Sequence, residues 1–129
     1  MEQLNYLIDT NVIIDYLGNK ISQSGMQFMN TVIDAVPNIS IITKIEVLGF
    51  NTTKSEYQIL IDFMDDSNVI ELSKNVADIC IEIRKRNKIK LPDAIIASTA
   101  LASNSALITR NIADFKNING LIVINPHNL

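Results

Sequence analysis

The chain alternates between short runs of consecutive apolar residues and longer stretches in which apolar residues recur at helical spacing. Tyr6-Leu7-Ile8, Ala106-Leu107-Ile108 and Leu121–Ile124 are apolar at every position. A strand with one face in water alternates apolar and polar residues, so an uninterrupted run is typical of a strand buried on both faces. Because helical stretches separate the runs, we expect a parallel sheet covered by helices on both sides.

We predict an α/β protein with one domain, residues 1–129, built as a three-layer α/β/α doubly wound sheet of about five mainly parallel strands. Breaks such as Gly18-Asn19 and Pro37-Asn38 and capping residues such as Thr53 and Ser73 mark the ends of the helices. The predicted strands are Tyr6–Ile8, Ile39–Ile42, Val69–Leu72, Ala106–Ile108 and Leu121–Ile124. The predicted helices are Val12–Leu17, Gln23–Val36, Thr43–Phe50, Thr53–Met64, Ser73–Asn87 and Pro92–Ser103.

Composition excludes several classes of protein. With 47% hydrophobic and 19% charged residues, the chain is too apolar for a disordered protein. Its single cysteine, Cys80, cannot form an internal disulfide and is expected to fill the core. No apolar run approaches the roughly 18 residues of a membrane span, and the first residues lack the basic segment of a signal peptide. We therefore expect a cytoplasmic protein with no membrane partner.

Four acidic residues fall where strands of the predicted sheet end. Asp9 closes the first strand, Glu46 lies one turn into the helix after the second, and Asp93 lies in the first turn of the Ala-rich helix. Asp114 is expected in the short connection between the last two strands. Ligands of such sheets bind beyond the carboxyl ends of the strands. We therefore expect all four carboxylates to face one crevice.

Carboxylates brought together in this way repel one another, and a divalent cation removes the repulsion. Ligands that are all oxygen favour Mg²⁺ or Mn²⁺, as one ion or two. Such ions lower the pKa of water and stabilise displacement at phosphorus. Since no Lys, His or Cys occupies a comparable position, the pattern favours metal-assisted hydrolysis of a phosphodiester over covalent catalysis.

Each acid also has a structural explanation on its own. Asp9 can cap the helix that follows it, and Thr43 with Glu46 forms a capping box. Asp93 suits the first turn of a helix for electrostatic reasons, and Asp114 suits a turn. The metal-site hypothesis therefore rests on the coincidence of the four.

Polar residues beside the acids are candidate supports. Asn11 is expected to hold a carboxylate or a water, and Thr43 belongs to the same set. Thr109, Arg110 and Asn111 end the fourth strand, where Arg110 is either a phosphate contact or a plain surface arginine. His127, a lone histidine, is expected to be inert.

Charge is concentrated in one basic segment. The net charge is −3, yet setting the four acids aside leaves 10 acidic residues against 11 basic ones. Five of those basic residues lie in Arg84–Lys90, directly before Asp93. This run either guides a nucleic-acid backbone towards the acids or is only the solvated end of a helix.

Five segments, in an order and spacing that cover nearly the whole chain, carry a family resemblance. Together they resemble the motifs of PIN-domain ribonucleases, and most closely those of VapC-type toxins of prokaryotic toxin–antitoxin pairs. The segments are L-I-D-T-N (Leu7–Asn11), T-K-I-E (Thr43–Glu46), L-P-D-A-I-I-A (Leu91–Ala97), T-R-N-I-A-D-F (Thr109–Phe115) and G-L-I-V-I-N-P (Gly120–Pro126).

The resemblance implies an endoribonuclease dependent on Mg²⁺ or Mn²⁺, with Asp9, Glu46, Asp93 and Asp114 as the metal-binding acids. It also implies a homodimer and a small antitoxin that inhibits it. Some relatives carry an acid where this chain has Asn111, which bears on a second metal ion.

Three alternatives remain open at this point. The chain can be a PIN-fold RNA-processing nuclease outside any toxin pair, or a catalytically silent binding module. A phospho-acceptor domain of the receiver type has a similar length, but it needs two adjacent acids after the first strand and a Lys after the fifth. This chain has Asp9 alone and no such Lys.

Overall fold

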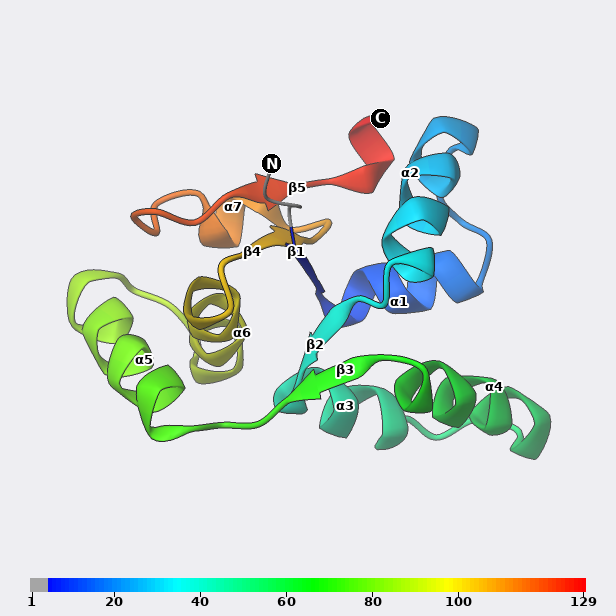
Figure 1. The fold of residues 1–129 in the computed structure, drawn as a ribbon, viewed down its shortest axis with the longest axis horizontal. Coiled ribbons are helices and arrows are strands. Elements are labelled where there is room, and N and C mark those ends of the chain that lie inside the picture. The colour runs from blue at the N-terminus through cyan, green and yellow to red at the C-terminus, as the bar shows by residue number, and fades with distance from the viewer. Residues whose placement is uncertain (1–4) are drawn as a thin grey trace.

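The computed structural model describes residues 5–129 and contains a five-stranded, entirely parallel sheet (Figure 1). The strand order is β3-β2-β1-β4-β5, so β1 lies at the centre, between β2 and β4. The predicted fold class is confirmed. The strands are β1 (Asn5–Ile8), β2 (Asn38–Ser40), β3 (Asn68–Ile70), β4 (Ser105–Ile108) and β5 (Val123–Ile124).

This strand order also removes one alternative. Receiver-type domains have the order 2-1-3-4-5, in which the first strand lies next to the third. Here the neighbours of β1 are β2 and β4. The receiver hypothesis is therefore wrong.

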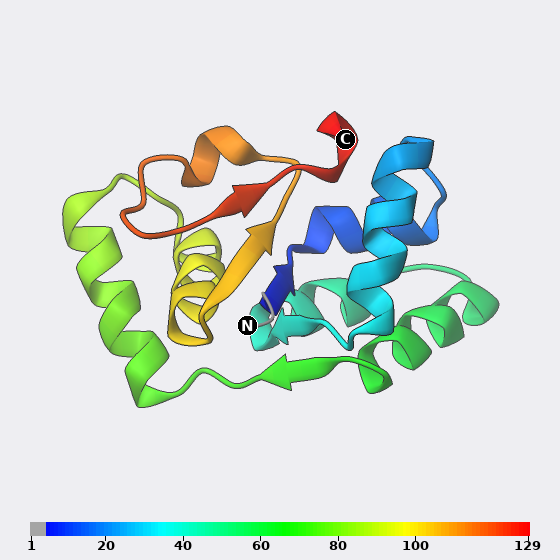
Figure 2. The same cartoon turned by 45° about the horizontal axis from the view of Figure 1, so that its top comes forward.

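Helices cover both faces of the sheet, with α5 and α6 on one side and α1, α2 and α4 on the other (Figures 1 and 2). Most helices begin where the sequence predicts, and Ser22, Thr53 and Ser73 each accept a backbone N–H at the start of a helix. The helices are α1 (Thr10–Leu17), α2 (Gln23–Asp34), α3 (Ile41–Leu48), α4 (Lys54–Asp65), α5 (Lys74–Arg86), α6 (Leu91–Ala102), α7 (Ile112–Phe115) and the short 3₁₀ helix η1 (Pro126–Asn128).

Consecutive residues of the central strands enter different halves of the core. Leu7 and Leu107 pack with α5 and α6, whereas Ile8 and Ile108 pack with α1, α2 and α4. All four side chains are completely buried. Side chains of a strand alternate between its faces, so a strand covered on both sides is apolar at every position. Burial on both faces of the sheet therefore explains the uninterrupted apolar runs in the sequence. Cys80 is buried in the half of the core that contains α5 and α6, as expected.

The second strand and the helix after it differ from the prediction. Strand β2 ends at Ser40, whose hydroxyl accepts the backbone N–H of Ile42 at 3.2 Å and caps α3. The chain therefore turns into a helix at Ile41, before the predicted start at Thr43. The predicted Thr43–Glu46 capping box is wrong, because Thr43 lies inside the helix and is fully buried. Strands β3 and β5 are also shorter than predicted.

The parallel arrangement brings several chain segments to one edge of the sheet. The carboxyl ends of β1, β2 and β4 point the same way, and α1, α3 and the segment before α7 follow them. Within residues 5–129, no helix is long and apolar enough to cross a membrane.

Candidate active site

Asp9 directly follows β1 and is held by three hydrogen bonds. Its Oδ1 accepts the backbone N–H of Thr10 at 2.8 Å, and its Oδ2 accepts Thr109 Oγ1 at 2.7 Å and Asn11 Nδ2 at 3.1 Å. The residue is 4% exposed and also caps α1. The structural and functional interpretations of Asp9 are therefore compatible, because the contacts that cap the helix also fix the carboxylate at the end of the central strand.

Glu46 lies in α3 and reaches the same edge of the sheet through Thr10. The Thr10 hydroxyl donates to Glu46 Oε1 at 2.8 Å and lies 3.2 Å from Thr43 Oγ1. Thr10 thus holds Asp9 with its backbone N–H and Glu46 with its side chain. Thr43, a candidate support in the sequence, contacts Thr10 and none of the four acids directly.

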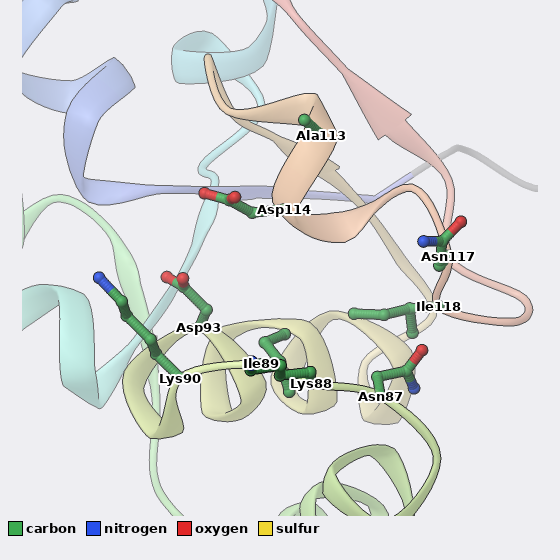
Figure 3. A pocket seen from close by; sticks show the side chains of 9 residues that line it. All are labelled: Asn87, Lys88, Ile89, Lys90, Asp93, Ala113, Asp114, Asn117 and Ile118. Atoms are coloured by element: carbon green, nitrogen blue, oxygen red, sulfur yellow. The ribbon is translucent and has the colours of Figure 1, made fainter.

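Asp93 and Asp114 come from opposite sides of a pocket, and Figure 3 shows both carboxylates at the same end of it. Asp93 lies in the first turn of α6, as predicted. Asp114 lies in the first turn of the short helix α7, whereas the sequence indicated only a connection. Phe115, buried to 1% exposure in the α5–α6 half of the core, anchors α7.

The pKa values of Asp93 and Asp9 are both raised in this environment. The pKa of Asp93 is raised by burial first and then by the negative charges of Asp9, Asp114 and Glu46, with Lys90 opposing the shift. The pKa of Asp9 is raised by burial, which outweighs the opposing hydrogen bonds from Thr109 and Thr10. Bringing these carboxylates together therefore lowers the free energy of unfolding of the protein.

The donor set suits a hard divalent cation. All four groups are carboxylates, and a cation between them would remove the repulsion that raises the pKa of Asp93. Asp9 is buried and held by three hydrogen bonds, whereas the Glu46 and Asp114 side chains are exposed. In the described part of the chain, no three Asp, Glu, His or Cys side chains lie close enough together to hold a metal ion between them.

The residues that follow β4 contact Asn11, Asp15 and Thr109. Arg110 donates its backbone N–H to Asn11 Oδ1 at 3.1 Å, while its guanidinium Nη1 pairs with Asp15 at 3.0 Å. The Asn111 N–H donates to Thr109 Oγ1 at 3.1 Å. The Arg110 side chain is thus a half-exposed surface arginine that forms an ion pair with the buried carboxylate of Asp15.

His127 makes a structural contact with Asp15. Its Nε2 lies 2.9 Å from Asp15 Oδ2, so Asp15 joins η1 to the end of β4. The contact between η1 and α2 is close, because a Cβ on Gly25 would lie 2.2 Å from Pro126 O. The C-terminal segment is therefore packed against α2 (Figure 2).

The basic run extends from α5 into the pocket beside the acids. Arg84–Arg86 form the last turn of α5, which agrees with the helix-end interpretation. Lys88 and Lys90 line the pocket with Asp93 and Asp114 (Figure 3). The run thus has two parts, and only the second faces the candidate site.

Sequence patterns missed Thr10 and Asp15. Thr10 stands beside Asp9 in the L-I-D-T-N segment, so a hydroxyl next to the first acid was an available signal. Asp15 interrupts an apolar stretch of α1 and is buried, which indicates a partner. Its partners lie 95 and 112 positions away, and no local pattern identifies them.

The family model of the PIN domain matches residues 6–121. The chain therefore belongs to the PIN-domain family. Members of this family are nucleases, which places the chain among the nucleases. The resemblance found from the sequence motifs is confirmed. No curated protein sequence matches the chain significantly.

Solved structures similar to this chain include toxin–antitoxin complexes. A toxin–antitoxin complex from Klebsiella pneumoniae contains a chain 33% identical to this one, with 95% of this chain and 98% of that chain covered and a TM-score of 0.74. For VapBC2 from Rickettsia felis bound to a promoter DNA fragment, the identity is 26%, the coverage is 95% and 98%, and the TM-score is 0.78. FitAcB from Neisseria gonorrhoeae shares the fold at 22% identity, with 96% and 99% covered and a TM-score of 0.81.

Proposed function

We propose that this protein is an endoribonuclease that uses Mg²⁺ or Mn²⁺ to hydrolyse RNA phosphodiester bonds with water. One observation carries the proposal. In a PIN-family chain, Asp93 is electrostatically coupled to Asp9, Asp114 and Glu46 at the carboxyl edge of a parallel sheet. This is the position at which such sheets bind ligands, and the carboxylates are brought together at a cost in folding free energy.

Asp9, Asp93 and Asp114 would hold one or two ions, and Glu46 would bind an ion or orient the attacking water. A bound divalent cation supplies positive charge that makes water a better nucleophile and stabilises charge on the phosphate oxygens. Thr109 and Asn11 keep Asp9 in place, and Asn111 supports Thr109 through its backbone. These hydrogen bonds favour the ionised form of Asp9.

The biological role we propose is that of the toxin in a type II toxin–antitoxin pair, acting in the cytoplasm. Similar structures are described as toxin–antitoxin complexes, one of them with 33% identity to this chain. On this proposal the protein forms a homodimer and is inhibited by a small cognate antitoxin. A PIN-fold nuclease that processes RNA without an antitoxin would have the same acids but would not arrest growth when expressed alone.

Cleavage of total RNA by the purified protein tests the chemistry. The reaction is run with Mn²⁺, with Mg²⁺ and with chelator, using wild-type protein, Asp93→Asn and the control Asp62→Asn. Asp62 is an exposed acid on α4, hydrogen-bonded to Gln58 and away from the acids. We expect discrete fragments that require metal, persist in the control and disappear in Asp93→Asn.

Growth of cells that express the chain tests the toxin role. Wild-type protein should arrest growth and Asp93→Asn should not. Cleavage without growth arrest would favour the RNA-processing alternative. A folded protein that neither cleaves RNA nor binds Mn²⁺ in calorimetry would refute the nuclease and leave the silent binding module.

A further inference from the structure

The pocket between α5, α6 and α7 continues away from the acids and has a different chemistry at its far end. Its volume is about 660 Å³, within the range of roughly 300–1,000 Å³ found for ligand sites. Figure 3 shows Asp93, Asp114 and Lys90 at one end, and Asn87, Asn117 and Ile118 at the other. One end is thus charged, and the other presents amides beside an apolar surface.

We propose that the far end of this pocket binds the base of an unpaired nucleotide next to the phosphate that is cleaved. This inference rests on the proposed nuclease function and adds the element of the substrate that is recognised. In it, Asn87 and Asn117 contact the edge of the base, and Ile118 contacts its face. Lys88 and Lys90 contact the phosphates.

The two asparagines are suited to reading a base. A primary amide has two N–H donors and a carbonyl acceptor, which matches the paired donors and acceptors of base edges. Asn87 is the C-terminal cap of α5, and its Nδ2 donates to Ile83 O at 3.0 Å. That bond orients the amide and leaves one N–H and the carbonyl oxygen for a ligand. Asn117 is exposed in the loop between α7 and β5.

Apolar side chains separate the amides from the acids. Ile118 is 6% exposed and packs in the same half of the core as Leu107. Ile89, partly buried against that core, lines the pocket between the two ends. A flat base bound there would cover apolar surface while its edge reached the amides. An inorganic phosphate bound there would make no favourable contact with these apolar side chains.

The charges in the pocket favour a nucleotide that is part of a longer nucleic-acid strand. Lys88 and Lys90 are exposed, and the positive charge of Lys90 acts on Asp93. Phosphate contacts position a strand without reading its sequence, whereas base contacts specify it. The base must be unpaired, because a base in a duplex keeps its edge paired and cannot enter a pocket.

Binding of short single-stranded oligoribonucleotides tests this proposal with metal chelated, so that cleavage plays no part. Four labelled oligonucleotides, each containing a single kind of base, are titrated by fluorescence anisotropy at several salt concentrations. The proteins are wild type, Asn117→Ala, Lys88→Gln and the control Asn119→Ala. Asn119 lies two positions further along the same loop and outside this pocket.

Wild-type protein should prefer one base over the others. Asn117→Ala should weaken binding of that oligonucleotide by about fivefold to tenfold, the effect of one or two hydrogen bonds, and leave the others nearly unchanged. Lys88→Gln should weaken all four equally and reduce the salt dependence by about one counterion. Asn119→Ala should behave as wild type.

Equal binding of all four bases by wild type, or an equal effect of Asn117→Ala and Asn119→Ala, would overturn the base pocket. Either result leaves metal-dependent cleavage untouched. Conversely, base-selective binding that depends on Asn117 in a protein without cleavage activity would support the pocket and refute the nuclease. Preference for a labelled DNA oligonucleotide of the same sequence over RNA would overturn the assignment to RNA.

Discussion

Replacing Thr109 with valine tests whether the hydrogen bonds around Asp9 compensate for the burial of its charge. The side chain is fully buried, and its hydroxyl donates to Asp9 Oδ2 at 2.7 Å. Valine has nearly the same shape but can neither donate to Asp9 nor accept the Asn111 N–H. A hydrogen bond to a charged group is worth about 1.5–3 kcal/mol, so the free energy of unfolding should fall by about 2 kcal/mol at pH 8. The melting temperature should fall by about 8 °C.

The effect should depend on pH in a defined direction. Burial raises the pKa of Asp9 in the folded protein, so ionisation of this group opposes folding. Its contribution to stability therefore falls as the pH rises from about 4, the ordinary value of aspartate, through the raised pKa. Valine removes a bond that favours the ionised form and raises this pKa further. The loss should shrink to about 1 kcal/mol near pH 4, the value of a neutral hydrogen bond.

Urea denaturation of both proteins in chelator, at pH 8 and near pH 4, measures this difference. Thr99→Val is the matched control, because Thr99 is buried to 1% exposure but donates to a backbone carbonyl, Ile95 O, at 2.7 Å. Its cost should be the same at both pH values. A cost for Thr109→Val that does not change with pH, or that equals the cost of Thr99→Val, would refute the reasoning.

Further predictions concern the acids and the C-terminal segment. In chelator at pH 8, Asp93→Asn should raise the free energy of unfolding by about 0.5 kcal/mol, because it removes a repelled charge that is partly screened by solvent; urea denaturation that shows a loss would contradict the electrostatic coupling. Mn²⁺ at about 100 times its Kd should stabilise the wild type by about 2.7 kcal/mol, as measured by thermal unfolding, and should stabilise Asp9→Asn much less. Gly25→Ala should lower the free energy of unfolding by about 1–3 kcal/mol, because its Cβ would lie 2.2 Å from Pro126 O. Ser24→Ala, at an exposed position of the same helix, is the control. Equal stability of the two variants would show that η1 does not pack as described.

The sheet was predictable because its cause is local. Leu7 and Ile8 enter opposite halves of the core, and this leaves an uninterrupted apolar run in the sequence. Asp9 and Asp93 were predictable for a similar reason, since each stands at a fixed place relative to a strand or a helix start. Asn11 also contacts the carboxylate expected for it.

Other features depend on contacts that no window of sequence contains. Ser40 and Thr43 are both acceptable helix caps, and the choice of Ser40 follows from burial of Thr43 beside Thr10 on another helix. The four-residue helix α7 around Asp114 is too short to show a helical period. The ion pair between Arg110 and Asp15 joins residues 95 positions apart, so its geometry appears only once β4 lies beside β1.

Asp9 and Thr109 are separated by 100 positions, so their hydrogen bond can form only late in the synthesis of the chain. Ribosomes add about 5–20 residues per second, so Asp9 waits at least about 5 s for Thr109 to be synthesised, and slightly longer for Asp114. Until then β1 can pair with β2 but not with β4, and the first carboxylate lacks its last partners. The four acids therefore come together only near the end of synthesis, once Asp114 has been added to the chain.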